Sequence, residues 1–265
     1  MYSKFQLARK YFQYYLTASN GKGHGIHSPF VFEFVTRVLN DKYKFDAYDL
    51  VESLRRKLEQ DMTVIDVEDL GAGSAKSNAP KRIVSNIAIH SAKSRKLGQL
   101  LFRVANYYKP KNILELGTSL GISSAYMAIA NPDAHVLTAE GSRSLADIAR
   151  SNFQHLHLNN IKVVEGNFEN SLSTMLEKLP TIDLAFIDGN HRKEPTLSYF
   201  KRLVSKATPK TIFIFDDIHW SREMEDAWKI IQDHPDVTCT IDIFFMGFVF
   251  FRSELKTKRH FTIRF

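Results

Sequence analysis

Three carboxylates follow two apolar segments in the second half of the chain. The sequence reads IDLAFIDGNH at 182–191 and TIFIFDDIHW at 211–220, so Asp188, Asp216 and Asp217 come directly after runs typical of buried strands. Carboxylates gathered at one sheet edge repel one another unless something positive lies between them. Oxygen ligands with open positions suit Mg²⁺ or another hard divalent cation. The alternative is that each aspartate only caps the helix after its strand.

Two histidines stand close to these carboxylates in the sequence. His191 lies three residues after Asp188, and His219 lies two residues after Asp217. An imidazole with a pKa near neutral can take a proton from a hydroxyl, so both are candidate general bases. Each can equally be a surface or helix-capping residue.

A glycine-containing turn is the strongest signal for ligand binding. Residues 112–130, NILELGTSLGISSAYMAIA, read as a strand, a turn and a helix that starts with small residues. Gly117 and Gly121 allow a sharp turn and leave room for a ligand. Glu140 ends the next apolar run, 19 residues after Gly121, where a carboxylate can accept hydrogen bonds from both hydroxyls of a ribose. Dinucleotide binding is disfavoured because only the first of the three glycines in GxGxxG is present. The turn could also simply connect the strand to the helix without binding a ligand.

The elements that position these residues alternate from residue 95 onward. Helical patterns separate five apolar runs, at 112–116, 135–139, 161–164, 182–187 and 211–215. This alternation requires a parallel sheet with helices on both faces. Three later runs, VTCTIDIFF, MGFVFF and HFTIRF, have no helix between them, so we expect antiparallel strands at one edge. The predicted fold class is α/β, a doubly wound, mostly parallel, seven-stranded sheet.

Residues 1–92 follow a different pattern. Apolar residues recur at helical spacing near the start, and Ser28-Pro29 is typical of a helix N-cap followed by proline at the first helical position. Residues 71–80 have the composition of a loop. We therefore expect a helical extension over 1–92, serving as a lid or a homodimer contact, and a catalytic domain over 93–265.

Composition excludes some classes of protein. With Cys239 as the one cysteine, the 265-residue chain has no internal disulfide framework, and a reducing, cytoplasmic setting is expected. No apolar run approaches the ~20 residues of a membrane span, so we expect no membrane partner. The net charge of +7 favours an anionic partner or substrate, although the basic residues are scattered rather than clustered as in many nucleic-acid-binding proteins.

The run ELGTSLG at 115–121 resembles the first motif of class I S-adenosylmethionine-dependent methyltransferases, and the similarity spans roughly residues 95–252. It implies that Glu115 and the glycine turn face the methionine part of S-adenosylmethionine, that Glu140 holds the ribose, and that VEGNF at 164–168 lies beside the adenine. The implied cofactor contacts are Glu115, Gly117, Thr118, Ser119, Gly121, Ser123, Glu140, Gly141, Asn167, Phe168 and Asp188.

The two aspartate segments are similar to those of metal-dependent O-methyltransferases of the catechol and macrocin type. That resemblance implies Mg²⁺ or another divalent cation on Asp188, Asp216 and Asp217, holding a small hydroxylated acceptor. Where the catechol enzymes have the lysine that serves as base, this sequence has His191, and His219 is a second candidate base. A metal lowers the pKa of a hydroxyl, and alignment of the hydroxyl with the sulfonium methyl supplies much of the rate.

Three alternatives stay open. DLGAGS at 69–74 could itself be a glycine motif, although a polar, lysine-containing loop follows it. The second alternative is a nucleic-acid methyltransferase. The segment IDGNH lacks the pair of prolines that base N-methyltransferases of this fold usually carry at this place, which argues against base N-methylation but not against ribose methylation. A non-catalytic S-adenosylmethionine-binding protein is the third, and the gathered carboxylates argue against it.

Overall fold

The computed structural model describes residues 1–68 and 81–265. It divides into two compact units: the terminal unit comprises Met1–Asp41 with Pro180–Phe265, and the central unit comprises Lys42–Leu179. The predicted loop at 71–80 and the whole of the second glycine motif at 69–74 lie outside the described residues. The domain boundary expected at 92/93 stays a prediction. In the parts that are described, no helix combines the length and apolarity needed to cross a membrane.

The central unit carries three parallel strands that alternate with helices, as the sequence predicts. Its strands are β3 (Asn112–Leu116), β4 (His135–Glu140) and β5 (Ile161–Glu165), paired in that order. The helices that follow them are α6 (Ile122–Ala130), α7 (Arg143–His155) and α8 (Phe168–Lys178). Before β3 come α3 (Asp46–Leu58), α4 (Val84–His90) and α5 (Arg95–Tyr108), with a small antiparallel pair, β1 (Val64–Asp66) and β2 (Lys81–Ile83). The buried strands place Glu115 and Glu140 at carboxyl ends, where ligands bind in such sheets.

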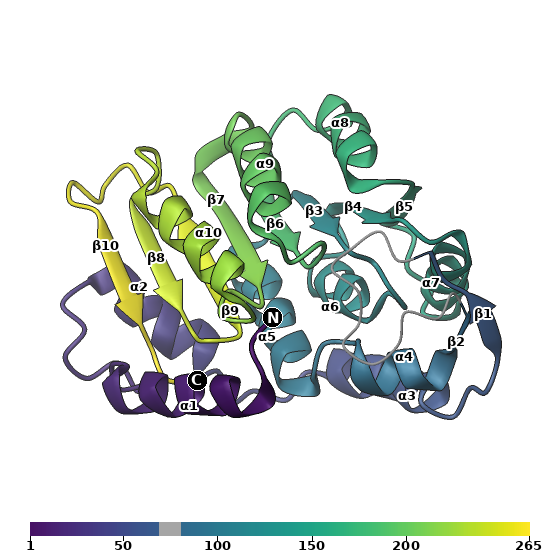
Figure 1. Cartoon of the computed structure of the whole chain (residues 1–265). Helices are drawn as coiled ribbons and strands as arrows, with labels where there is room; N and C mark the ends of the chain where they lie inside the picture. The colour runs from purple at the N-terminus through teal and green to yellow at the C-terminus, as the bar shows by residue number, and fades with distance from the viewer. Residues whose placement is uncertain (69–80) are drawn as a thin grey trace. The chain divides into compact units, whose positions relative to one another are not determined.

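The terminal unit carries the remaining strands (Figure 1). They are β6 (Ile182–Ile187), β7 (Ala207–Asp216), β8 (Cys239–Asp242), β9 (Met246–Phe250) and β10 (Arg259–Thr262), in the spatial order β10-β8-β9-β7-β6. Its helices are α1 (Lys4–Thr17), α2 (Pro29–Phe34), the short π-helix η1 (Val35–Leu39), α9 (Lys193–Val204) and α10 (Arg222–Asp233). Ser28 caps α2 as predicted, accepting a hydrogen bond from the Val31 backbone nitrogen at 3.4 Å, with proline at the first position.

Successive residues of β9 show how helices cover both faces of these strands. A side chain added at Gly247 would meet the Trp228 ring of α10, 2.6 Å away, so the absent side chain lets that ring pack directly on the strand. On the other face, the ring of Phe248 lies 5.1 Å from that of Phe34 in α2. Alternating strand side chains thus bury against different helices, and the mostly parallel, doubly wound α/β fold class is confirmed.

The end of the sheet differs from the prediction in one respect. β8 and β9 are antiparallel, as expected, but β10 pairs parallel with β8. Apart from the small β1-β2 pair, the described residues form three strands in the central unit and five in the terminal unit, one more than the seven expected. A tight turn at 243–245 reverses the chain between β8 and β9. The longer connection at 251–258 carries the chain back to the other end, so β10 runs in the direction of β8.

The turn after β3 uses glycine for packing. Gly121 has a φ of 81°, and a Cβ there would lie 2.6 Å from a ring atom of Phe153 in α7. The sequence-based expectation that this glycine leaves room for a ligand is therefore corrected, because the space at its Cβ position is taken by an aromatic ring of the same unit.

We expect Gly121→Ala to destabilise the protein more than Gly25→Ala. Gly25 has a similar φ of 79°, but no described heavy atom lies within 4 Å of its Cβ position, so its replacement should cost only about 1–2 kcal/mol for the left-handed backbone. Gly121→Ala adds the clash with Phe153, about 1–3 kcal/mol more. Urea unfolding of both variants measures the difference. Equal losses would show that Phe153 moves aside freely.

Candidate functional site

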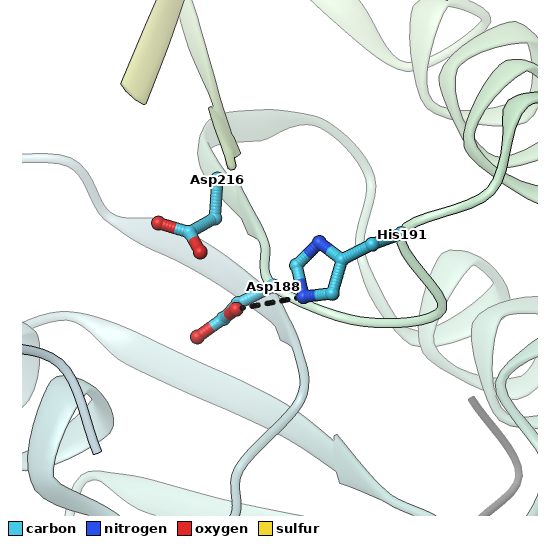
Figure 2. Close-up of side chains that lie close together, drawn as sticks. All are labelled: Asp188, His191 and Asp216. Carbon is cyan, nitrogen blue, oxygen red and sulfur yellow. Dashed lines mark ion pairs between the residues drawn. The ribbon is translucent and has the colours of Figure 1, made fainter. Parts of the chain in front are cut away.

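Two strand ends of the terminal unit bring together Asp188, His191 and Asp216 (Figure 2). Asp188 directly follows β6, and Asp216 is the last residue of β7, which pairs parallel with β6. Each residue offers one ligand atom, and these atoms all lie within 4.8 Å of one another. His191 reaches back from the following loop, its Nε2 lying 3.5 Å from Oδ1 of Asp188. We call these three residues the Asp–His cluster.

The Asp–His cluster is partly open to solvent. Asp216 is 1% exposed, whereas the side chains of Asp188 and His191 are 15% and 22% exposed. Two negatively charged carboxylates so close together repel each other unless a cation or an imidazolium lies between them. The cluster is therefore suited either to binding a divalent cation or to acid–base chemistry in which Asp188 stabilises a protonated His191.

Asp217 does not join the Asp–His cluster. Its φ of 52° places it in the left-handed region, its N–H donates to the Phe245 carbonyl at 2.7 Å, and its own carbonyl accepts from the Trp220 N–H. Neighbouring residues at a strand end point in different directions, so the sequence pair Asp216-Asp217 does not supply two ligands to this cluster. The third member of the cluster is His191, which the sequence suggested only as a base.

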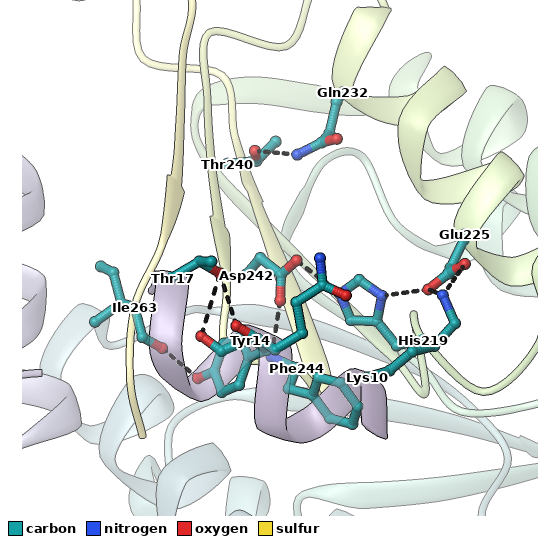
Figure 3. Close-up of polar contacts among 11 residues, drawn as sticks. Lys10, Tyr14, Thr17, His219, Glu225, Gln232, Thr240, Asp242, Phe244 and Ile263 are labelled. Atoms are coloured by element: carbon teal, nitrogen blue, oxygen red, sulfur yellow. Dashed lines mark hydrogen bonds and ion pairs between the residues drawn. The ribbon is translucent and has the colours of Figure 1, made fainter. Parts of the chain in front are cut away.

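His219 lies between two other carboxylates (Figure 3). Its Nδ1 is 3.0 Å from Oε1 of Glu225, its Nε2 is 2.8 Å from Oδ2 of Asp242, and its ring stacks on Phe244. Burial disfavours the charged imidazole, but the hydrogen bonds and charges of Asp242 and Glu225 outweigh burial and raise the pKa of His219 above its ordinary 6.5. With both nitrogens engaged, His219 is poorly placed to act as the base that the sequence suggested.

We expect the unfolding temperature of His219→Gln to fall less steeply than that of the wild type as the pH rises above 6.5. Since the folded-state pKa of His219 lies above 6.5, its contribution is complete below pH 6.5 and is lost as the pH rises through that raised pKa. Burial by itself raises the pKa of Glu225, but hydrogen bonds from Lys10, Tyr2 and His219 outweigh burial and lower that pKa, so Glu225 acts only on the acid side. Thermal unfolding of wild type and variant across pH 6–10, taken as a difference, cancels the titrations of groups that do not interact with His219. Parallel curves would contradict the assignment.

The central unit holds the predicted cofactor residues at the ends of β3 and β4. Glu140 is 8% exposed, and its carboxylate accepts hydrogen bonds from the backbone nitrogens of Ser119, at 2.7 Å, and Ser142, at 2.9 Å. The backbone nitrogens of Gly117 and Thr118 both donate to the Ala139 carbonyl, which ties the turn to β4. Glu140 and the glycine turn, 19 residues or more apart in sequence, therefore form one hydrogen-bonded unit.

Glu115 lies beneath this turn and is fully buried. Its carboxylate accepts hydrogen bonds from the hydroxyls of Ser123, at 2.6 Å, Thr138, at 2.6 Å, and Ser124. Burial raises the pKa of Glu115 to about 7, although the three hydroxyl donors favour the ionised form. In this arrangement Glu115 and Ser123 brace the turn from inside, and their direct contact with a cofactor stays a prediction.

The other predicted cofactor residues lie on the turns after β4 and β5. Asn167 is exposed and caps α8, accepting from the Glu169 N–H at 2.8 Å. Phe168 and Gly141 are partly exposed. The Gly166 N–H donates to the Glu140 carbonyl at 2.8 Å, so the two turns are neighbours.

Sequence reasoning missed Thr138 and Ser142, which hold Glu115 and Glu140 in place. The signal for Thr138 is the strand register, which pairs it with Glu115 and which no single-sequence pattern supplies. Ser142 lies two residues after Glu140, a spacing at which a backbone nitrogen commonly reaches an acidic side chain.

Comparison with known proteins adds independent findings. Residues 114–218 match the sequence profile of the methyltransferase domain family. The chain is 30% identical over 124 residues to a catechol O-methyltransferase of Niastella koreensis, an alignment that covers 46% of this chain and 55% of that protein. It is 31% identical over 94 residues to a tRNA (guanine-N(7)-)-methyltransferase of Mycoplasma mobile, covering 34% of this chain and 47% of that protein. The chain thus spans about half the length of the curated relatives it matches.

Among solved structures, an O-methyltransferase of Streptomyces achromogenes in complex with S-adenosylmethionine is similar in fold. The TM-score is 0.57 at 19% identity, covering 80% of this chain and 92% of that one. At this identity the likeness concerns the fold, and it agrees with the architecture described above.

Proposed function

We propose that this chain, whose residues 114–218 belong to the methyltransferase domain family, transfers the methyl group of S-adenosylmethionine to an oxygen of a small hydroxylated molecule. The observation that carries the proposal is the Asp–His cluster, which lies within the matched residues and offers groups that can hold or deprotonate a hydroxyl. A relative bearing the name catechol O-methyltransferase agrees with oxygen as the acceptor atom.

The cofactor site in this proposal is built on the glycine turn and Glu140. The backbone N–H groups of Ser119 and Ser142 fix the orientation of the Glu140 carboxylate, the type of group that can accept hydrogen bonds from both hydroxyls of a ribose. Gly117, Thr118, Ser119 and the backbone of Gly121 would line the methionine part, and Gly141, Asn167 and Phe168 the adenosine. Asp188 is also proposed to contact the cofactor.

The donor set of the Asp–His cluster fits a divalent cation. Two carboxylates and one imidazole differ from the oxygen-only set expected from the sequence: the carboxylates suit Mg²⁺ or Mn²⁺, and the imidazole suits Zn²⁺ or Fe²⁺. We therefore propose a divalent cation on Asp188, His191 and Asp216, with Mn²⁺ or Zn²⁺ preferred. When bound, the cation would stabilise the acceptor's oxyanion and so lower the pKa of its hydroxyl.

The residues of the chain would do the remaining work. Asp216, almost fully buried, would keep its charge fixed toward the acceptor, while the more exposed Asp188 and His191 would contact it. If the cluster works without metal, His191 would take the hydroxyl proton through one nitrogen, and Asp188 would stabilise the resulting imidazolium. Holding the acceptor oxygen in line with the sulfonium methyl would supply much of the rate.

We expect calorimetry to show S-adenosylmethionine binding at micromolar concentration, and methyl transfer to a panel of catechols and related polyols that rises with added Mn²⁺. The demethylated cofactor, S-adenosylhomocysteine, should bind as a product inhibitor. No binding of either form to folded protein would overturn the proposal. Methylation of RNA but of no small molecule would favour the nucleic-acid alternative. The tRNA methyltransferase relative and the net charge of +7 support that alternative.

A cytoplasmic setting belongs to the same proposal. The one cysteine, Cys239, is buried and free, as a reducing compartment allows.

A further inference from the structure

Helix α1 is anchored in the terminal unit through one face. The rings of Tyr11 and Tyr14 lie 5.0 and 5.3 Å from that of Phe244, and Tyr14 is 7% exposed. Lys10 forms an ion pair with Glu225 at 2.9 Å, one of the polar contacts drawn in Figure 3. These contacts fix which side of α1 faces away from the rest of the terminal unit.

The opposite face of α1 is apolar and exposed. Phe5, Phe12 and Leu16 are 81%, 63% and 61% exposed, and Tyr15 beside them is 51% exposed. At 100° per residue, positions 5, 12 and 16 fall within a narrow stripe almost opposite Tyr14, and the small Ala8 lies at its margin. We call Phe5, Ala8, Phe12, Tyr15 and Leu16 the outer stripe. A contiguous exposed stripe of large apolar side chains is unusual on a protein surface and marks an interaction site.

Cations border the outer stripe along both sides. Lys4 and Arg9 are exposed and fall on opposite flanks of the stripe, and the guanidinium of Arg264 lies 5.0 Å from the Tyr15 ring centroid. The helix itself contains no acidic residue. Its partner must therefore offer apolar volume at the centre and negative charge around it.

We infer that the outer stripe seats the protein on an anionic lipid bilayer. An amphipathic helix with Phe and Leu on one face and Lys or Arg at its margins lies in the plane of the interface, with apolar side chains below the headgroups and cations among the lipid phosphates. A second copy of the chain fits less well, because pairing two such helices would bring like charges together. The inference departs from the sequence-based expectation of no membrane partner, which rested on the absence of a spanning segment.

The test is co-sedimentation of the full chain with vesicles of phosphatidylcholine alone and with about one-third phosphatidylserine. We expect binding to the anionic vesicles, reduced at least about tenfold in Phe5→Ser/Phe12→Ser because two large apolar groups no longer enter the interface. Lys4→Gln/Arg9→Gln should lower binding to the anionic vesicles and weaken its decrease with added salt, since Arg264 remains beside the stripe. Ile230→Ser, at a residue 45% exposed on α10, is the matched control and should bind as wild type.

Circular dichroism and thermal unfolding show whether each variant keeps its fold. Equal binding to neutral and anionic vesicles, or none to either, would overturn the inference. So would a concentration-dependent dimer in sedimentation velocity that Phe5→Ser/Phe12→Ser abolishes, since the stripe would then be a contact between copies of this chain. Because vesicle binding is read without cofactor or acceptor, its failure is distinct from failure of the proposed enzymatic activity.

Discussion

Asp216→Asn is expected to abolish divalent-cation binding and methyl transfer while leaving the protein folded. Asp216 is the buried carboxylate of the Asp–His cluster, and its ligand atom lies within 4.8 Å of those of Asp188 and His191. Asparagine has the same shape but lacks the charge. Loss of a direct ligand should lower metal affinity by at least about 100-fold, and kcat by about 10²–10³-fold through lost stabilisation of the oxyanion.

The measurement that separates metal binding from structure is thermal unfolding with and without Mn²⁺. Without metal, Asp216→Asn should unfold at the wild-type temperature or above it, because one of two mutually repelling carboxylates is gone. With Mn²⁺ the wild type should gain stability and the variant should not, since a ligand stabilises only the state that binds it.

Two control variants sharpen the result. Asp217→Asn should keep metal binding within about threefold, because Asp217 lies outside the cluster and asparagine tolerates its left-handed backbone. Asp226→Asn, on the exposed surface of α10, controls for loss of one negative charge. If Asp217→Asn removed the metal as fully as Asp216→Asn does, the ligand set deduced from the sequence would hold instead.

Glu140→Gln is expected to lower S-adenosylmethionine affinity by about 100-fold or more. The carboxylate accepts from the backbone nitrogens of Ser119 and Ser142, and an amide can turn only one oxygen toward those two donors. The variant therefore loses the acceptor for the ribose hydroxyls and also loosens the glycine turn, and each charge-assisted hydrogen bond contributes about 1.5–3 kcal/mol.

Calorimetric titration with S-adenosylhomocysteine measures this loss without turnover. Glu177→Gln, on the exposed side of α8, makes the same chemical change away from the turn and should bind as wild type. Unfolding by urea shows whether the loosened turn destabilises the central unit. A Glu140→Gln protein that is folded and binds the cofactor normally would remove the glycine turn from the proposed site.

The fold class and the strands that carry the site were predictable because they depend on local patterns. Alternating apolar strands and amphipathic helices allow few arrangements other than a doubly wound sheet, and all five apolar runs after residue 95 are strands of the structure. The match of residues 114–218 to the methyltransferase domain family confirms the motif-based reading for that segment. The direction of β10 was not predictable, since it depends on where a long loop returns the chain.

Which side chains come together in each cluster could be learned only from the tertiary structure. The sequence by itself determined that Asp188, Asp216 and Asp217 follow two apolar runs typical of strands and that His191 and His219 follow closely. Only the fold decided that His191 joins Asp188 and Asp216, that Asp217 turns elsewhere through a left-handed backbone, and that His219 is held by Glu225 and Asp242. The reason is physical: periodicity specifies which residues end a strand, whereas side-chain direction at that end is set by backbone torsions and by partners far away in sequence.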